Sequence, residues 1–280
     1  METTRFEQLA TLSHPQRMAV FRMLLRRYPD AVPAGEIGTA LDLKPSTASV
    51  YLSALRDCGL VSQRREGRSL LYRAEIAGIQ GLVAFLWQDC CHGRPDLCPA
   101  PVPAPGDTAM PDRKYNVLFI CTGNSARSIF AETLLRQMAG DRFEAFSAGT
   151  RPSSELNPIA VAMLEDKGMD TAPLRAKNVA EFQGPEAPAM DFVFTVCDRA
   201  ANEDCPAWPG QPISAHWGLP DPVKAEGTEA ERRLAFQQVF GMLKNRLTAF
   251  TALPIDTLDR ISLQREVDRI GTTDHEDTPA

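Results

Sequence analysis

The sequence predicts two domains of different fold class, a mainly α-helical domain followed by an α/β domain with a central parallel sheet. Apolar residues recur at helical spacing through residues 4–60. From position 116 onward, short apolar runs alternate with amphipathic segments, as strands alternate with helices in parallel sheets. Between the two patterns lies PAPVPAPGDTAMPDR, whose alternating proline and alanine favour an extended linker. The 280 residues, 44% of them hydrophobic, suffice for two cores.

These patterns set the expected domain limits. The first domain covers 1–92, with a ligand site that runs on to 98; a linker follows at 99–113, the second domain at 114–252, and a C-terminal helix and tail at 253–280.

Charge and cysteine usage indicate the partners and the compartment. Residues 1–100 carry 12 Lys/Arg against 10 Asp/Glu, whereas residues 101–280 carry 18 against 26. We therefore expect any nucleic acid to contact the first domain. The start METTRFEQ lacks a signal-peptide pattern and no apolar run approaches the length of a membrane span, so a cytoplasmic protein without membrane contact is expected. The seven cysteines should then be thiols rather than structural disulfides.

The first domain contains a helix pair followed by a basic hairpin. Residues 4–27 predict two short helices, and residues 32–43 and 44–60 predict two more, joined by a tight turn in the helix-turn-helix pattern. The following LVSQRREGRSLLYRAE predicts a two-stranded hairpin. The last of these helices would enter the major groove of DNA and the arginines would meet phosphates or the minor groove. The expected DNA-binding residues are Ser46, Thr47, Ser49, Tyr51, Arg64, Arg65 and Arg68.

A solvated face on a protein-interaction domain is the alternative reading of this segment. However, residues 5–90 resemble the arsenic- and metal-sensing winged-helix repressors of the ArsR/SmtB family through LSHPQRMAVFRMLL, LKPSTASVYLSALRDCGLV and RREGRSLLYR. The resemblance implies a homodimer that binds operator DNA and releases it when an inducer binds. It also implies that a helix over 76–89 packs with the first helix at the dimer interface.

Cys90, Cys91 and Cys98 follow that helix. Trivalent arsenic is thiophilic and three-coordinate, so three converging thiolates would bind arsenite as the inducer. The glycine and proline after Cys91 predict the helix end that lets neighbouring cysteines converge. The spacing resembles the C-terminal inducer sites of some arsenite-responsive repressors. Zinc with His92 as a fourth ligand, or three unrelated buried thiols, are the alternatives.

The second domain opens with VLFICTGNSARS, an apolar strand that leads through a loop into a helix. Ligands of parallel sheets lie at the carboxyl ends of the strands, where Cys121 falls. The Cys-x5-Arg spacing lets loop amides surround one tetrahedral oxyanion while Arg127 binds two of its oxygens. These amides, the helix N-terminus and the Ser128 hydroxyl would lower the pKa of Cys121 and make it a nucleophile, the alternative being an inert buried cysteine. The expected substrate-binding loop is Thr122, Gly123, Asn124, Ser125 and Ala126.

The remaining pattern of this domain alternates in the same way. We expect strands at 143–149, 192–196 and 213–217, helices at 159–167 and 229–250, and a docked helix within 253–270.

From Tyr115 to Phe250 the chain resembles the low-molecular-weight protein tyrosine phosphatases, and more closely the arsenate reductases built on that fold. The matching segments are ICTGNSARSIFAE, FSAGT, FVFTVCDRAANEDCPAWPGQP and HWGLPDP. In the family, the aspartate of the Asp-Pro pair, here Asp221, is the general acid. Reduction of arsenate needs two electrons, which the further thiols Cys197 and Cys205 can supply, whereas a phosphatase needs no such thiols.

The resemblance implies a thiol-disulfide cycle without a required cofactor. Cys121 attacks arsenate, Asp221 assists loss of water, Cys197 releases arsenite by attacking Cys121, and Cys205 then displaces Cys121. Thioredoxin would reduce the resulting disulfide, although a mycothiol- or glutathione-linked cycle without Cys205 stays open. We expect Cys197 and Cys205 on a mobile loop, because Cys197 must reach two partners.

Some relatives hold a structural potassium ion at the positions of Asn124, Glu132 and Ser147, although Asn124 more often braces the loop. The sequence as a whole predicts an arsenic-resistance protein in which an arsenite-responsive repressor is fused to an arsenate reductase. The alternatives are a tyrosine phosphatase fused to a metal-responsive repressor, and a DNA-binding sensor with an inactive catalytic domain.

Overall fold

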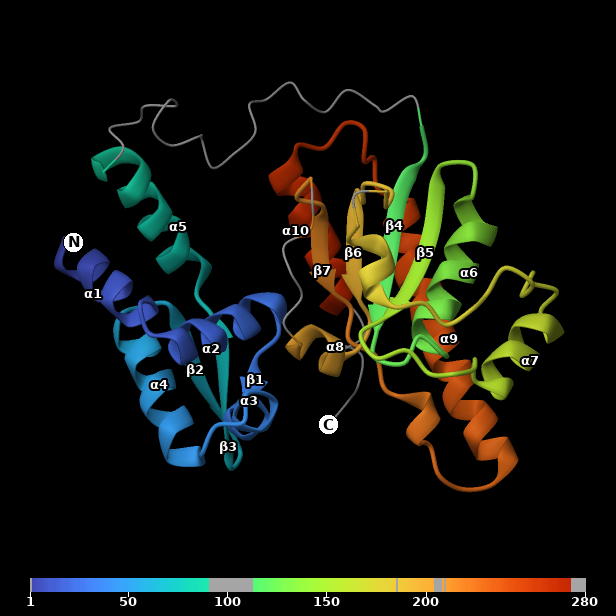
Figure 1. The fold of residues 1–280 in the computed structure, drawn as a ribbon, viewed down its shortest axis with the longest axis horizontal. Helices are drawn as coiled ribbons and strands as arrows, with labels where there is room; N and C mark the ends of the chain where they lie inside the picture. The colour runs from blue at the N-terminus through green and yellow to red at the C-terminus, as the bar shows by residue number, and fades with distance from the viewer. Residues whose placement is uncertain (1, 91–112, 185, 204–207, 209, 273–280) are drawn as a thin grey trace. The chain divides into compact units, whose positions relative to one another are not determined.

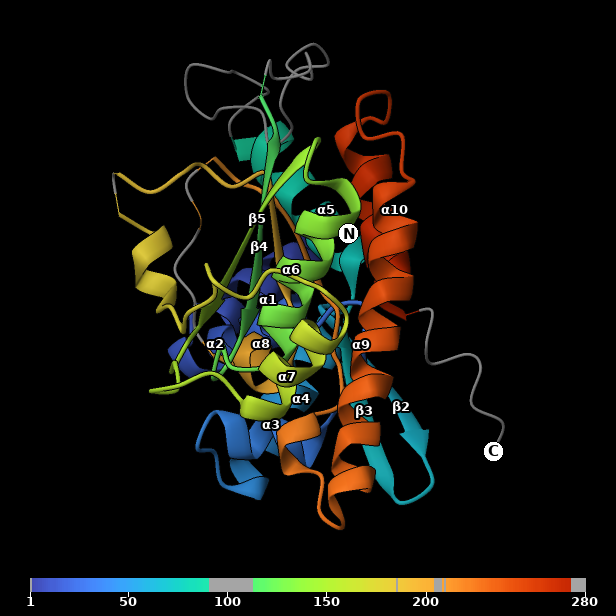
Figure 2. The same cartoon turned by 90° about the vertical axis from the view of Figure 1, so that its right-hand side faces the viewer.

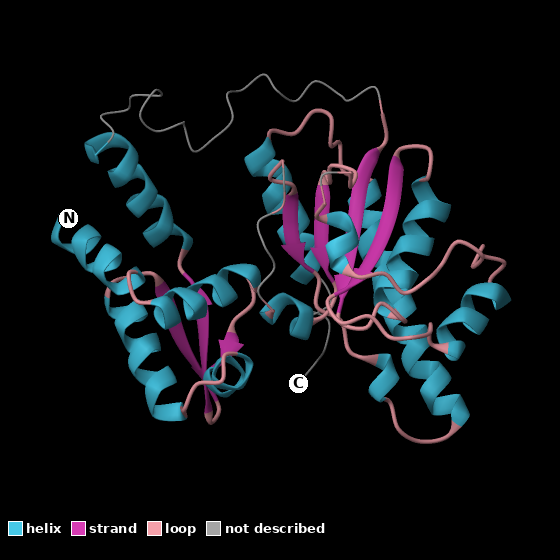
Figure 3. Cartoon of the chain, viewed as in Figure 1, coloured by secondary structure: helices cyan, strands magenta, loops and turns pink. Residues whose placement is uncertain are grey.

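The computed structural model describes residues 2–90, 113–184, 186–203, 208 and 210–272. The chain divides into two compact units, Met1–Thr108 and Ala109–Ala280. Helices dominate the first unit, whereas strands and helices alternate in the second (Figure 1, Figure 3). The expected linker, apart from Arg113, and the cysteines Cys91, Cys98 and Cys205 lie outside the described residues.

The first unit is a small three-stranded sheet with helices around one core. In chain order its elements are α1 (Glu2–Leu12), α2 (Pro15–Arg26), β1 (Val32–Pro33), α3 (Ala34–Ala40), α4 (Pro45–Asp57), β2 (Val61–Glu66), β3 (Ser69–Ala74), α5 (Ile76–Phe85) and the π-helical turn η1 (Leu86–Cys90). The strands are antiparallel in the order β1-β3-β2. Side chains from α2, α4 and the hairpin, such as Leu24, Leu52 and Tyr72, are buried together.

The expected helix over 32–43 is wrong at both ends. Val32 and Pro33 pair with β3 as a short strand, and the helix covers only Ala34–Ala40. Pro33 is the N-cap of α3 with an extended backbone (φ −62°, ψ 140°). A proline also keeps the preceding residue extended, so Val32 cannot begin a helix. The completely buried Val32 side chain instead joins the core.

The second unit contains the predicted central parallel sheet. Its elements are β4 (Tyr115–Cys121), α6 (Arg127–Ala139), β5 (Phe143–Gly149), α7 (Pro158–Asp166), the 3-10 turn η2 (Val179–Phe182), β6 (Phe192–Thr195), α8 (Asp198–Asn202), β7 (Ile213–His216), the 3-10 turn η3 (Pro222–Lys224), α9 (Glu229–Thr251) and α10 (Arg260–Thr272). The four strands are all parallel in the order β5-β4-β6-β7.

Helices cover both faces of this sheet. In Figure 2, α6, α9 and α10 lie on one face, and the unlabelled yellow turn that contains η2 lies on the other. On the α9 side, the ring of Phe250 contacts Phe143, Phe192 and Phe194 at centroid distances of 5.1 to 5.3 Å. Burying each such ring stabilises the fold by about 1.5–3 kcal/mol. These aromatic contacts therefore pack α9 against β5 and β6.

Helix α10 covers the edge strand β7. The Trp217 indole Nε1, just beyond the strand, donates to Val267 O at 3.0 Å, and Gln264 Nε2 donates to Ser214 O at 2.8 Å. A Cβ atom at Gly271 would lie 2.7 Å from His216 O, so this position needs glycine for the close approach. An otherwise open strand edge is thereby closed.

Among the described helices, none combines the length and the apolar character that crossing a bilayer requires.

Candidate active site

The predicted catalytic residues that the structure describes in the second unit lie at one edge of its sheet. Because the strands are parallel, their carboxyl ends face the same way. Cys121 ends β4, Gly149 ends β5, and Cys197 follows two residues after the end of β6. The sheet therefore brings together loops that are distant in the sequence.

The loop after β4 wraps around the Cys121 sulfur. The backbone N–H of Asn124 donates to this sulfur at 3.1 Å, and the Ser128 hydroxyl oxygen lies 3.0 Å from it. Asn124 has a left-handed backbone (φ 47°), which asparagine tolerates better than most residues. The predicted contact between Ser128 and the sulfur is therefore present, and the loop curls back on its own cysteine.

A second loop, residues 149–157, supports the predicted anion-binding loop (residues 122–126) from outside. Four backbone N–H groups of this segment donate to the carbonyl oxygens of residues 121, 122, 123 and 125, over 2.8 to 3.1 Å. A Cβ atom at Gly149 would lie 2.7 Å from Thr122 O, so the glycine of the FSAGT segment permits this close approach. The curvature of the anion-binding loop is thus fixed by the chain that follows β5.

The expected lowering of the Cys121 pKa is wrong for this arrangement. Cys121 is 3% exposed, and burial raises the pKa of its thiol, with the nearby Cys197 sulfur raising it further. The Ser128 hydrogen bond and the Arg127 charge act in the opposite direction but do not prevail. The Arg127 guanidinium is directed to other partners: its Nη2 lies 3.1 Å from Asp221 Oδ2, and its Nη1 donates to Leu219 O at 3.1 Å.

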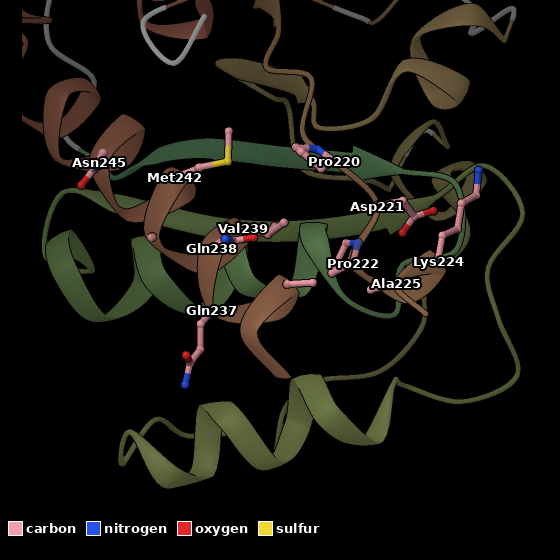
Figure 4. A pocket seen from close by; sticks show the side chains of 12 residues that line it. Pro220, Asp221, Pro222, Lys224, Ala225, Gln237, Gln238, Val239, Met242 and Asn245 are labelled. Atoms are coloured by element: carbon pink, nitrogen blue, oxygen red, sulfur yellow. The ribbon is translucent and has the colours of Figure 1, made fainter. Parts of the chain in front are cut away.

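The contact between Arg127 and Asp221 joins two predicted catalytic residues from different elements. Arg127 begins α6, whereas Asp221 caps η3 by accepting from Val223 N. A pocket of about 750 Å³ lies on the α9 side of Asp221 (Figure 4). The carboxyl of Asp221 thus faces solvent-accessible space as well as the arginine. The pocket is lined by Pro220, Asp221, Pro222, Lys224, Ala225, Ala235, Gln237, Gln238, Val239, Gly241, Met242 and Asn245.

The second predicted redox thiol lies beside the same loop. Cys197 is 1% exposed, and its sulfur lies 3.4 Å from Thr122 Oγ1. Directly after Cys197, residues Asp198–Asn202 form the short helix α8, which Cys197 caps by accepting from Ala200 N at 3.4 Å, whereas residues 204–207 of the expected mobile loop lie outside the described residues. The third thiol, Cys205, lies outside the described residues, so its approach to Cys197 stays a prediction from the sequence.

A buried network behind the loop contains a lysine that the sequence analysis missed. Asn124 Oδ1 accepts from Lys177 N at 2.7 Å, while Asn124 Nδ2 donates to Ser128 and Ser147. Ser147 in turn donates to Glu132, and Lys177 Nζ lies 2.9 Å from Glu132 Oε2. Asn124 therefore braces the loop, and the buried Lys177–Glu132 ion pair completes the network.

The residues expected to hold potassium do not fit a further cation. Glu132, the charged member of the predicted set, already has the Lys177 ammonium beside one carboxylate oxygen and Arg136 Nη2 at 2.5 Å from the other. Its negative charge is thus compensated by side chains, and we assign potassium no role.

The predicted DNA-binding residues divide into two groups. Ser46 and Ser49 are exposed on α4, and Arg64, Arg65 and Arg68 are exposed around the turn between β2 and β3. Thr47 is half-buried, and Tyr51 leans back onto α2, where its hydroxyl donates to Gln16 Oε1 at 2.6 Å. Val50, which the sequence analysis missed, is 65% exposed on α4 and has the apolar surface that suits a thymine methyl group.

Helices α1 and α5 share an exposed apolar face. Phe6 on α1 is 60% exposed and stacks edge-on against Phe85 of α5, while Val83 and Leu86 are also exposed. Cys90 ends the following turn and is exposed. The described residues hold no group of three His, Cys, Asp or Glu side chains that could bind a metal, since Cys91 and Cys98 lie outside them.

Comparison with known proteins finds a match for each unit. Residues 116–267 match the family described as low molecular weight phosphotyrosine protein phosphatase, and residues 12–64 match a helix-turn-helix domain. The arsenate reductase of Bacillus licheniformis is 36% identical over 138 residues, which cover 49% of this chain and 95% of that protein. The arsenate reductase of Bacillus subtilis is 37% identical over 134 residues, covering 48% and 93%. These matches confirm the expected order of a helix-turn-helix domain and a phosphatase-fold domain in one chain.

Proposed function

The chain belongs to the low molecular weight phosphotyrosine protein phosphatase family, and we propose that its second domain, which resembles the arsenate reductases, reduces arsenate to arsenite. We further propose that its first domain represses transcription until arsenite binds. The arsenate reductases that resemble the second domain over nearly their whole length support the choice of substrate.

The position of Cys197 is the observation that carries the proposed reaction. Its buried sulfur lies against Thr122, the neighbour of Cys121 in the anion-binding loop. A phosphatase needs a nucleophile, an arginine and an acid, because water completes the hydrolysis. Arsenate reduction also needs two electrons, and a second thiol beside the nucleophile can supply them.

In the proposed cycle, the Cys121 thiolate attacks the arsenic of arsenate, and Asp221 protonates the departing oxygen, which leaves as water. The Cys197 thiolate then attacks the Cys121 sulfur. The electron pair of the sulfur–arsenic bond stays with arsenic, which leaves as arsenite. Cys205 next attacks the Cys197 sulfur and releases Cys121 as a thiolate. An external thiol, from thioredoxin or a low-molecular-weight thiol, supplies the two electrons that reduce the Cys197–Cys205 disulfide.

The raised pKa of Cys121 gives Arg127 a defined part in this cycle. When arsenate binds, the Arg127 guanidinium turns from Asp221 to the arsenate oxygens. Its positive charge then lies nearer the Cys121 sulfur and favours the thiolate over the thiol. Asp221 then no longer contacts the guanidinium, and its carboxyl can donate a proton to the departing oxygen. One movement of Arg127 thus prepares both the nucleophile and the acid.

For the first domain, we propose operator binding through α4 and the basic hairpin, as a homodimer joined through α1 and α5. The exposed serines and arginines support the first part, and the exposed Phe6, Val83 and Leu86 support the second. Arsenite would bind Cys90, Cys91 and Cys98 and release the DNA.

The reductase proposal is tested with the purified full chain and arsenate. Turnover is measured with thioredoxin, mycothiol and glutathione in parallel, and we expect Cys197→Ser to abolish it. Cys58→Ser is the matched control, because Cys58 is also buried but its sulfur donates to Leu55 O in the other domain. Unchanged arsenate turnover by Cys197→Ser would refute the cycle.

A phosphatase is the second candidate, favoured by the same anion-binding loop and by the contact between Arg127 and Asp221. It predicts that the chain hydrolyses p-nitrophenyl phosphate and that Cys197→Ser retains this hydrolysis. A sensor with an inactive catalytic domain predicts instead that arsenite releases DNA while arsenate oxidises no thiol.

The sensor proposal is tested by fluorescence anisotropy on DNA from upstream of the gene. We expect arsenite to release the DNA from the native chain and not from Cys90→Ser. Full release from Cys90→Ser would exclude this cysteine as a ligand.

A further inference from the structure

We propose that His216 is a positioning residue that holds the Cys197 thiol beside the anion-binding loop by linking Thr195 to Asp198. The importance of this thiol rests on the proposed reductase function. The link itself is a property of the fold and is tested separately below.

His216 spans the junction that carries Cys197. It ends β7 opposite Thr195, the last residue of β6. Its Nδ1 lies 2.8 Å from Thr195 Oγ1, and its Nε2 lies 3.0 Å from Asp198 Oδ1. Only Val196 and Cys197 lie between these two partners in the chain. One imidazole ring therefore fastens the residues on both sides of the thiol.

The chemistry of the partners fixes the direction of the hydrogen bonds. An ionised carboxylate only accepts, so Nε2 donates to Asp198. In the neutral ring, Nδ1 then accepts from the Thr195 hydroxyl. The imidazole is fully buried although the Asp198 side chain is 56% exposed, so the ring is the anchored member of the link.

The surroundings leave room for this link and keep its strand in place. A Cβ atom at Gly218 would lie 2.8 Å from both Asp198 Oδ1 and His216 Nε2. Trp217 N donates to Thr195 O at 2.8 Å, and the indole stacks on Phe194 at 4.1 Å. Besides its contact with Asp198, His216 is thus held by the pairing of β7 with β6 and by the contacts of the adjacent Trp217 with Phe194 and α10.

The link constrains Cys197 through the start of α8. Asp198 is the first residue of this five-residue helix, and Cys197 caps it. A helix this short has little stability of its own, so its first residue needs an external support. With the support in place, the Cys197 sulfur stays near Thr122; without it, the junction opens and the thiol is exposed to solvent.

The test measures the exposure of Cys197 in the full chain by iodoacetamide labelling and peptide mass spectrometry. Thr195→Val and Asp198→Ala each remove one arm, and we expect each to raise the labelling rate of Cys197 about tenfold. Asp198→Asn keeps an acceptor for Nε2 and should restore slow labelling. Arg199→Ala, which removes an exposed side chain from the same helix, is the matched control, and Cys121 is the internal reference.

The kinetic counterpart is a lower kcat for arsenate with an unchanged KM in Thr195→Val and Asp198→Ala, because attack by Cys197 depends on its placement. Equal labelling of Cys197 in Asp198→Ala and Arg199→Ala overturns the proposal. So does a parallel rise at Cys121, which would indicate general loosening. If the native chain does not reduce arsenate but Asp198→Ala exposes Cys197, the reductase function fails while the link stands.

Discussion

Cys121 and Cys90 both end a secondary-structure element, yet their surroundings differ in every respect that controls a thiol. Cys121 is buried, accepts a backbone N–H, and touches Ser128 in a loop that a second loop supports. Cys90 is exposed at the last residue of a π-helical turn. The first arrangement fixes a sulfur relative to an anion, whereas the second leaves a sulfur accessible to a ligand.

The two sites also differ in how far apart their residues lie in the sequence. The bracing network of Cys121 joins Asn124, Ser147 and Lys177, which different segments contribute. The proposed arsenite ligands lie within nine residues of one another in the sequence. A preorganised catalytic site thus depends on the whole fold, whereas a soft ion can be bound by a short stretch whose thiols close around it.

The largest expected effect separates the two sites by function. Cys121→Ser should lower arsenate turnover by at least roughly 10³-fold, because a hydroxyl at this position is a far weaker nucleophile. Its arsenite-dependent DNA release should equal that of the native chain. Cys90→Ser should show the reverse, measured by the same two assays. If either variant impairs both activities, the two sites are not independent.

Next in size is the effect of the buried ion pair that supports the Cys121 loop. Lys177→Met should lower the free energy of unfolding of the second domain by about 2 kcal/mol, because the buried Glu132 carboxylate loses one of its two cationic partners and keeps only Arg136. The double variant Lys177→Met/Glu132→Gln should recover part of this loss in urea denaturation. The exposed pair Arg175–Glu181 is the control, since Arg175→Met should change stability by less than about 1 kcal/mol.

The accessibility of the two thiols gives a third, smaller difference. Iodoacetamide should label Cys90 at least about tenfold faster than Cys121 in the native chain, because buried groups react through opening. Burial raises the pKa of Cys121, so its labelling rate should still be rising with pH where an ordinary thiol has levelled off. Peptide mass spectrometry between about pH 6 and about pH 10 checks both statements. If the labelling rate of Cys121 levels off at the pH expected of an ordinary thiol, the predicted rise in its pKa is contradicted.

The smallest effect distinguishes titration of the scaffold from titration of the thiols. Burial raises the pKa of Asp268 on α10 to about 6, from an ordinary value of 3.8. The folded state therefore holds this proton more tightly, and the stability it contributes is lost as pH rises from about 4 to about 6. Asp268→Asn should stabilise the protein by about 1 kcal/mol at neutral pH and flatten the pH dependence of Tm.

Asp259, a carboxylate at the start of α10, serves as the control because its pKa is shifted in the opposite direction. The Ser262 hydroxyl lowers the pKa of Asp259, so Asp259→Asn should not stabilise the protein at neutral pH. Equal stabilisation by both variants would show that net charge, rather than burial of Asp268, sets the effect.

Local patterns in the sequence were enough to predict the architecture and the anion-binding loop. The alternation of strands and helices predicted the parallel sheet, and the Cys-x5-Arg spacing predicted the contact between Cys121 and Ser128. Both depend on residues that are close in the chain. The family resemblance added Asp221, which the fold places beside Arg127.

The residues and elements that the sequence analysis missed or predicted wrongly depend on contacts that a local sequence pattern does not reveal. Lys177 and His216 act on residues far away in the sequence, so neither is distinguished from an ordinary polar residue until the chain folds. A loop was expected directly after Cys197, but Asp198–Asn202 form a short helix that the cysteine caps. Val32 lies in a helical pattern, but the proline after it and its pairing with β3 make it a strand.

The dependence of the anion-binding loop on Gly149 and Lys177 has a consequence for biosynthesis. A ribosome releases the chain from its N-terminus, so Cys121 emerges before the residues that brace it. Parallel strands pair only after the crossover between them is complete, which delays the loop further. The nascent thiol thus passes through an unshielded interval, whereas the first unit, contiguous in the sequence, already has all the residues of its core. During this interval the Cys121 sulfur is as accessible to oxidants as the sulfur of any unfolded cysteine, and the completed fold then buries it.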